Sequence, residues 1–132
     1  MSVEQNIAVV RAIYDAFNTR DIDKVFSLLS PDLVLEDVTT GQAFRGPEGF
    51  MQWVQPFAAA SPETTANLTH IIASGEWVFT EHTGGGPHVA PLVTPAGEIP
   101  VTGRPLEIKF AEVFQVQDGK IILLRAYWVP AR

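Results

Sequence analysis

The stretch of sequence that decides the fold is RPLEIKFAEVFQVQDGKIILLRAYW, residues 104–128. It contains two runs rich in alternating apolar residues, separated by Gln117-Asp118-Gly119-Lys120, a pattern typical of a β-hairpin. Successive side chains of a strand point to opposite faces of its sheet, so the even-numbered residues of the first run share one face. These residues are Leu106, Ile108, Phe110, Glu112 and Phe114.

Glu112 is the one polar residue on this apolar face. An ionised carboxylate buried among apolar side chains is costly, so it either finds a partner or holds its proton. We therefore interpret Glu112 as a site carboxyl. The alternative is a bulge or an edge position that would turn the side chain to solvent.

Composition limits the class of protein. The chain has 132 residues, a size at which one domain spanning residues 1–132 can bury a substantial core. Its net charge of −6 and the lack of a Lys/Arg cluster argue against nucleic acid or an anionic membrane as a partner. No apolar run is long enough to span a membrane and no basic-then-apolar leader opens the chain, so the expected location is cytoplasmic. The absence of cysteine excludes thiolate chemistry.

Three helices are expected in the N-terminal half. The first opens with a capping box at Ser2 and Gln5, and its apolar stripe turns Tyr14 inward. The second is capped by Asp21 and stops at Pro31. The third begins at 46–48, and Pro56 should kink it or end it early.

The rest of the chain reads as strand. We expect strands over residues 32–40, 67–73, 76 to about 92, 105–117 and 121–129. In the first of these, one carboxylate of the pair Glu36 and Asp37 should point into the interior. Three helices ahead of a curled antiparallel sheet predict an α+β domain whose helices close one side and leave a pocket.

The residue types favour acid–base chemistry. Neither a phosphate-binding glycine loop nor a Gly-x-Ser-x-Gly elbow is present, and the three histidines lack the helical spacing of a zinc site. A three-histidine metal site built from separate strands is the less favoured alternative. The polar groups that could converge are Tyr14, Asp37, His82, His88 and Glu112. Each also has a structural interpretation: Asp37 could cap a turn, Tyr14 could bond a backbone carbonyl, and either histidine could be an exposed strand residue.

The sequence resembles the SnoaL-like polyketide cyclases, of the superfamily that includes ketosteroid isomerase and nuclear transport factor 2. The stretches that carry the resemblance are YDAFN (14–18) with DID (21–23), LED (35–37), FRGPEGF (44–50), GPH (86–88), PLVTPAGEIPVTGR (91–104) and DGKI (118–121). They cover nearly the whole chain in the family's order, and the run ending in Thr102-Gly103-Arg104 is the most specific.

The resemblance implies a cone-shaped curved antiparallel sheet around a deep pocket, a homodimer, and no metal or organic cofactor. It also implies that Tyr14 and Asp37 stand where the isomerases keep their oxyanion-binding tyrosine and their base, and Glu112 where the cyclases often carry a polar pocket residue. Two positions depart from the pattern. The cyclases have their catalytic aspartate at the position of Ala126, and many relatives have an acidic residue at that of Val129.

The sequence leads to two hypotheses. The first is a cofactor-independent acid–base enzyme, of cyclase, isomerase or epoxide-opening type, for a hydrophobic oxygenated molecule such as a polyketide or terpenoid intermediate. Its acid–base pair would be Glu112 and Asp37, with Tyr14 or His88 donating to an oxyanion. Its pocket walls would be Trp53, Trp77, Phe79, His82, Phe110, Phe114 and Trp128. The second is a non-catalytic module that binds a small molecule or dimerises, which Ala126 and Val129 favour.

Overall fold

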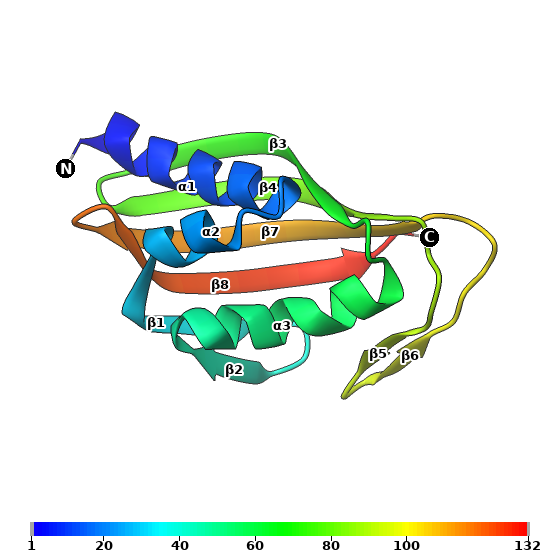
Figure 1. Ribbon diagram of the computed structural model, residues 1–132. Helices are drawn as coiled ribbons and strands as arrows, with labels where there is room; N and C mark the ends of the chain where they lie inside the picture. The colour runs from blue at the N-terminus through cyan, green and yellow to red at the C-terminus, as the bar shows by residue number, and fades with distance from the viewer. Residues whose placement is uncertain (1, 132) are drawn as a thin grey trace.

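The computed structural model describes residues 2–131 and has two layers (Figure 1). Three helices, α1 (Val3–Asn18), α2 (Ile22–Leu28) and α3 (Gly46–Ala60), lie on the same face of a six-stranded sheet. The strands follow the order β2-β1-β8-β7-β4-β3. Their bounds are β1 (Leu29–Asp37), β2 (Gln42–Arg45), β3 (Thr65–Ser74), β4 (Trp77–Gly86), β7 (Leu106–Gln117) and β8 (Lys120–Pro130). The predicted α+β class is confirmed.

The sheet is mixed rather than purely antiparallel. β1 runs parallel to β8, and every other neighbouring pair is antiparallel. Two parallel strands must be joined by a long connection that returns the chain to the same end of the sheet. Here the whole chain from β2 to β7 forms that connection between β1 and β8. Short strands β5 (Leu92–Thr94) and β6 (Gly97–Ile99) form a separate arm that the sequence did not predict.

Helix starts follow the sequence, whereas two predicted helix ends differ: α2 ends at Leu28, three residues before Pro31, and the early end of α3 at Pro56, predicted as the alternative to a kink, does not occur. Ser2 and Gln5 form the capping box, and Asp21 accepts the Lys24 N–H. α3 does not end at Pro56 but continues to Ala60. Proline removes the one hydrogen bond that would have gone to the carbonyl of Gln52, which is an exposed residue, so water can replace it.

The strand predicted over residues 76 to about 92 ends earlier than expected. β4 stops at Gly86, because the backbone then turns to the end of α3, where the N–H groups of Val89 and Ala90 donate to the carbonyl of Ala60. The first strand begins at Leu29, three residues before the predicted start at Asp32.

The hairpin at residues 117–120 is confirmed. Asp118 and Gly119 both have positive φ, 51° and 77°, as a type I′ turn requires. Glu112 is 4% exposed and pairs in register with Ala126, and the shift in the β7–β8 ladder lies beyond it at Gln115/Val116. The alternative of a bulge that exposes Glu112 is therefore wrong.

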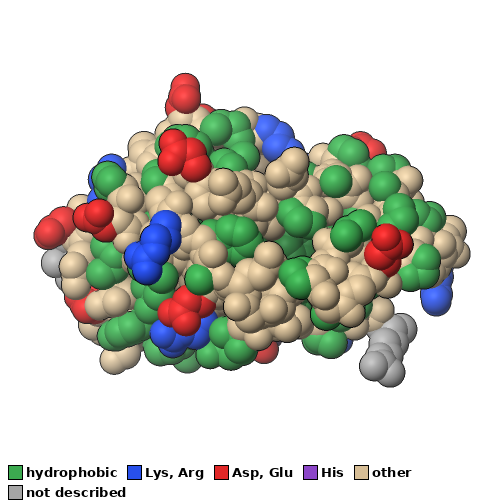
Figure 2. Space-filling view, turned by 90° about the horizontal axis from the view of Figure 1, so that it is seen from below, with side chains coloured by type: hydrophobic (Ala, Val, Ile, Leu, Met, Phe, Trp, Pro, Cys, Tyr) green, Lys and Arg blue, Asp and Glu red, His purple; other side chains and the backbone are tan. Residues whose placement is uncertain are grey.

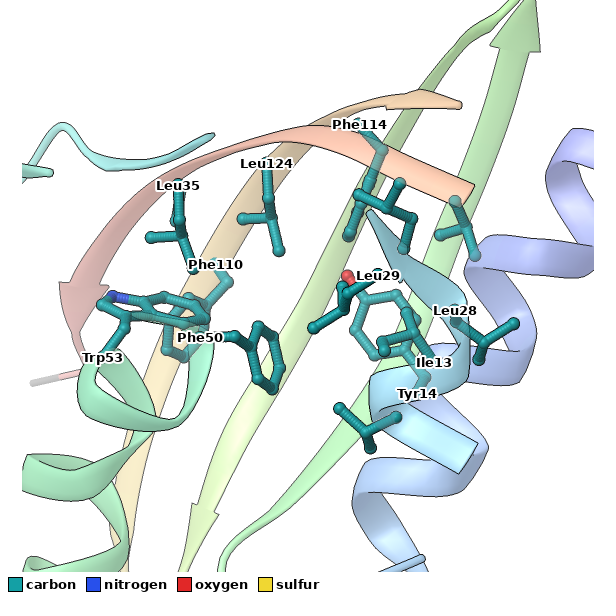
Figure 3. Close-up of a cluster of buried hydrophobic side chains, with 14 of the residues drawn as sticks. Ile13, Tyr14, Leu28, Leu29, Leu35, Phe50, Trp53, Phe110, Phe114 and Leu124 are labelled. Atoms are coloured by element: carbon teal, nitrogen blue, oxygen red, sulfur yellow. The ribbon is translucent and has the colours of Figure 1, made fainter. Parts of the chain in front are cut away.

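The core fills the space between the helices and the inner face of the sheet. Figure 3 shows Tyr14 and Ile13 of α1, Phe50 and Trp53 of α3, and Phe110 of β7 pointing into this layer. Tyr14 faces inward, as the helical periodicity predicted. None of the helices in residues 2–131 has the length and apolar character needed to cross a membrane.

Candidate active site

A row of side chains crosses the inner face of the sheet and defines the site. Register pairs Thr80 of β4 with Glu112 of β7, Glu112 with Ala126 of β8, and Ala126 with Asp37 of β1. All four residues are buried. Paired residues on adjacent strands project to the same face, so Ala126 separates the two carboxylates.

Glu112 is held by donors from two other elements. The hydroxyl of Tyr14, on α1, donates to Glu112 Oε1 over 2.5 Å, and Nδ1 of His82, on β4, lies 3.2 Å from the same oxygen. Among residues 2–131 no side chain donates to Oε2. The carboxylate is thus fixed by one oxygen and leaves the other for a ligand.

Tyr14 acts here as a donor to Glu112. Its oxygen also lies 2.7 Å from Thr80 Oγ1, and since the phenol proton goes to Glu112, the Thr80 hydroxyl donates to Tyr14. Burial, then the charge of Glu112 and the hydrogen bond to it, raise the pKa of Tyr14 far above its ordinary range, against a smaller opposite effect of Thr80. The phenol therefore stays protonated at any working pH.

His82 completes the cluster. Its ring stacks on Phe110, with centroids 4.4 Å apart and planes 9° from parallel. Nδ1 lies 3.2 Å from both the Tyr14 oxygen and Glu112 Oε1, which fits an Nδ1–H donor shared between them. The other ring nitrogen, Nε2, makes no hydrogen bond within residues 2–131. The imidazole is thus oriented by a carboxylate and keeps one nitrogen for chemistry.

An apolar cavity of about 70 Å³ adjoins these groups. Glu112, Tyr14 and His82 supply its polar atoms, and Trp53, Phe110, Phe114 and other apolar residues form its walls. Gly84 lies against the Phe110 ring, and a Cβ there would come within 2.9 Å of it. A carboxylate and an imidazole at an apolar cavity can move a proton to or from a bound molecule.

The predicted pocket walls are only partly correct. Trp53, His82, Phe110 and Phe114 line the cavity. Trp77 and Phe79 do not, because the alternation of β4 turns Thr80 and His82 inward and the odd-numbered residues to the outer face, where Phe79 is 39% exposed. Trp128 lies at a neighbouring groove instead.

Asp37 does not join Glu112 in the cavity, contrary to the predicted acid–base pair. Its carboxylate points inward, as expected for one of the residues 36–37, but it accepts the indole N–H of Trp53 at 2.9 Å and that of Trp128 at 3.0 Å. It also accepts the backbone N–H of Thr40, so it does cap a turn. With these donors in place, Asp37 ties α3, β1 and β8 together.

The groove beside Asp37 lies between α3, β2 and the β5–β6 arm, with a volume of about 350 Å³. Figure 2 views the molecule from this side and shows apolar side chains where the main body meets the arm. Trp53 and Phe57 line both the groove and the inner cavity, so their rings separate the two spaces.

His88 also lies away from Glu112. It follows the end of β4 and borders a separate chamber, and its Nε2 is buried without a hydrogen-bond partner in residues 2–131. A role for His88 as a donor to an oxyanion beside Glu112 therefore finds no geometric support.

Sequence reasoning missed two features of the site. Thr80 was not considered, although it stands two residues before His82 on the same face of β4. The contact of His82 with Glu112 depends on a strand register that no local pattern reveals. No group of three or more His, Asp or Glu side chains within residues 2–131 is arranged to hold a metal ion.

This fold and site define a class: small α+β domains in which helices and a curved sheet enclose an apolar pocket with acid–base groups at its end. The SnoaL-like domain matches residues 10–124, and the chain belongs to this family. No curated protein matches it in sequence.

Solved structures support the assignment. The chain is similar to IdmH, a proposed polyketide cyclase from Streptomyces antibioticus, with 27% identity, a TM-score of 0.76, and coverage of 94% of this chain and 91% of that one. An LEH-like epoxide hydrolase from M. tuberculosis has 25% identity, a TM-score of 0.70, and coverage of 96% and 84%. A proposed ketosteroid isomerase from Kribbella flavida has 18% identity, a TM-score of 0.74, and coverage of 98% and 82%, and shares the fold.

Proposed function

We propose that this protein is a cofactor-independent acid–base enzyme, of cyclase, isomerase or epoxide-opening type, for a hydrophobic oxygenated small molecule. The observation that carries the proposal is the Glu112 carboxylate, held by Tyr14 and His82 at an apolar cavity. Similarity to a proposed polyketide cyclase and to an epoxide hydrolase supports this range of reactions.

In the proposed mechanism Glu112 moves the proton. Oε2 takes a proton from a carbon next to a substrate carbonyl, or from water that opens an epoxide, and becomes a carboxylic acid. Tyr14 keeps its own proton and fixes Oε1, so it positions the base rather than binding the oxyanion. In its doubly protonated form His82 keeps Nδ1–H on Glu112 and also carries a proton on Nε2, from which it donates a hydrogen bond to the substrate oxygen as charge develops there. The proton on Glu112 then returns to the product.

A second candidate function is a binding module without turnover. One observation favours it: Ala126 replaces the usual aspartate of the cyclases that the sequence resembles. Glu112 and His82 favour the enzyme, because a purely apolar wall would bind an apolar ligand without the cost of burying both.

The test combines a ligand search with matched variants. Native mass spectrometry of the purified protein identifies bound small molecules. Turnover is then measured on these and on a panel of a β-keto ester, a β,γ-unsaturated ketone and a terpene epoxide. Glu112→Gln keeps the shape and an acceptor for Tyr14, and we expect it to lower turnover by about 10²-fold or more.

The matched control is Glu81→Gln, which removes a carboxylate from the exposed face of the neighbouring strand and should leave turnover unchanged. An unchanged rate in Glu112→Gln would remove Glu112 from the mechanism. Binding without turnover by the parent across the panel would favour the binding module.

We further propose that the protein is a homodimer that pairs through the outer face of its sheet. The helices cover only the inner face (Figure 1), and the outer face leaves Ile72 69%, Phe79 39% and Tyr127 42% exposed. An antiparallel sheet with apolar residues on both faces needs a second cover. Light scattering should give a dimer for the parent and a monomer for Phe79→Asp; a monomeric parent at micromolar concentration would contradict the proposal.

A further inference from the structure

Thr80 is a polar member of the row across the sheet that has no part in the proposed mechanism. It stands on β4, is 4% exposed and pairs in register with Glu112. It does not line the inner cavity, so it does not contact a molecule held there. Its hydroxyl oxygen lies 2.7 Å from the oxygen of Tyr14 and has no other hydrogen-bond partner within residues 2–131. Thr80 can therefore act on the site only through Tyr14.

The direction of the hydrogen bonds in this cluster follows from Glu112. An ionised carboxylate can only accept, so the Tyr14 hydroxyl gives its single proton to Oε1, at 2.5 Å. The phenol oxygen is then left as an acceptor, and the Thr80 hydroxyl donates to it. The Tyr14 ring extends from α1 into the layer beneath the sheet (Figure 3), so the chain of two hydrogen bonds runs from β4 through α1 to β7.

The first bond of this chain strengthens the second. A donor to the phenol oxygen stabilises negative charge on that oxygen, which makes the phenol O–H a stronger donor in turn. The pKa of Tyr14 responds in the same sense: burial and then Glu112 raise this pKa, whereas the hydrogen bond from Thr80 acts to lower it. Thr80 therefore tightens the bond from Tyr14 to Oε1.

Thr80 also decides where the Nδ1 proton of His82 goes. Nδ1 lies 3.2 Å from two acceptors, the phenol oxygen of Tyr14 and Glu112 Oε1. The phenol oxygen already accepts from Thr80 over a shorter distance, and the carboxylate is the stronger acceptor of the two. The Nδ1–H is thereby left to Glu112. Without the Thr80 hydroxyl, the phenol oxygen would compete for this proton.

We propose that Thr80 is a positioning residue of the site: by donating to Tyr14, it directs the protons of Tyr14 and His82 onto Glu112 Oε1 and leaves Oε2 free. Within residues 2–131 no side chain donates to Oε2. The consequence for turnover rests on the proposed function, in which Oε2 takes the proton. The pattern of hydrogen bonds does not, and it is measured without a substrate.

Proton and nitrogen NMR of the protein with isotope-labelled histidine tests this pattern. Thr80→Val removes the hydroxyl and keeps the shape of the side chain, and valine is favoured in strands. We expect the His82 Nδ1–H resonance to move upfield, because its acceptor changes from a carboxylate to a phenol oxygen. The Tyr14 hydroxyl resonance should also move upfield as its own hydrogen bond weakens. Thr80→Ser keeps the hydroxyl, so both resonances should stay near their positions in the parent.

Turnover gives a second measurement. Thr80→Val should lower kcat about 5–10-fold, the scale of one weakened hydrogen bond, and change KM by less than about 2-fold, because Thr80 does not contact the ligand. Thr80→Ser should keep most of the parent kcat. The matched control is Thr83→Val, which removes a hydroxyl from the outer face of the same strand and should change neither the resonances nor the rate.

A double-mutant cycle shows whether Thr80 acts through Tyr14. In Tyr14→Phe no phenol oxygen is left to accept a hydrogen bond from Thr80. Adding Thr80→Val to this variant should therefore have no further effect on the His82 resonance or on kcat.

Three results would overturn the inference: a His82 Nδ1–H resonance that is unchanged in Thr80→Val, a Thr80→Ser variant that behaves like Thr80→Val, or a full effect of Thr80→Val in the Tyr14→Phe background. The parent alone provides a fourth, since a His82 without a proton on Nδ1 cannot donate to Glu112, whatever the folding of the variants. A parent without turnover would overturn the proposed function, whereas the resonances would still decide the role of Thr80.

Discussion

Replacing Ala126 by aspartate tests the arrangement of the site most directly. Ala126 is fully buried and stands in register between Glu112 on one side and Asp37 on the other. Directly paired residues have Cβ atoms about 5 Å apart, so Ala126→Asp would bring a third carboxyl into contact distance of two existing ones.

The size of the effect follows from Coulomb's law. At about 5.5 Å and an effective dielectric constant of about 20, two carboxylates repel by about 3 kcal/mol. Glu112 alone would impose this cost. Asp37 would add less than that, because Trp53 and Trp128 already donate to its carboxylate. The introduced carboxyl avoids part of the repulsion by holding its proton, so its pKa is raised in the folded state.

Because the pKa of the introduced carboxyl is raised in the folded state, the free energy of unfolding of Ala126→Asp must fall as the pH rises. Below the ordinary pKa of a carboxyl both folded and unfolded states carry the proton, and the repulsion is absent. As the pH rises past that value, the unfolded chain loses its proton first, so the variant loses stability by about 1.4 kcal/mol per pH unit until the raised pKa is reached. Because about 3 kcal/mol corresponds to about two pKa units, we expect this total loss between about pH 4 and about pH 6.

The assay is urea unfolding of Ala126→Asp and of Ala126→Asn at both pH values. The asparagine variant has nearly the same shape and no charge, so the difference between the two isolates the carboxylate. Equal stability of the two variants at both pH values would show that position 126 is not beside Glu112, and would refute the row Thr80, Glu112, Ala126 and Asp37 across the sheet.

We also expect no ring-closing activity in Ala126→Asp, because the added acid disturbs the group that we propose as the base. Gain of cyclase turnover where the parent has none would favour the binding module.

Two further predictions concern the groups that hold the buried carboxylates. Tyr14→Phe removes a donor to Glu112 and should destabilise the fold by about 1.5–3 kcal/mol, the usual range for a hydrogen bond to a charged group, whereas Tyr127→Phe on the outer face should change it little in the same urea titration. Trp128→Phe removes one of the two indole donors of Asp37, and we expect a loss of about 2 kcal/mol, against a small effect of Trp77→Phe at the outer face. Equal effects of Trp128→Phe and Trp77→Phe would contradict the role assigned to Asp37.

Local patterns predicted much of the fold. Alternation in residues 106–114 put Glu112 on the buried face, and Asp118-Gly119 marked the turn, because both signals depend only on neighbours in the sequence. The parallel pairing of β1 with β8 was beyond such signals, since it joins strands more than eighty residues apart. β2, β5 and β6 are too short for an alternating pattern to identify.

The site was predicted less well than the fold, and Asp37 shows why. Its burial followed from the apolar faces of its strand, but its partners Trp53 and Trp128 come from α3 and β8. The inward direction of a carboxylate is a property of its own strand, whereas its hydrogen bonds depend on the packing of distant elements. The same holds for His82, whose contact with Glu112 requires the register of β4 against β7.

Glu112 and Asp37 show how one row of the sheet can assign different roles to the same chemical group. Asp37 accepts from two indoles and a backbone N–H, and among residues 2–131 these donors occupy both of its oxygens. Glu112 receives its donors on Oε1 only, and it borders the cavity. A carboxylate whose oxygens are both bonded has no oxygen left to contact a ligand, whereas Glu112 keeps Oε2 for one. Ala126 keeps the two apart, so in the mechanism that we propose Glu112 is the single base of the pocket.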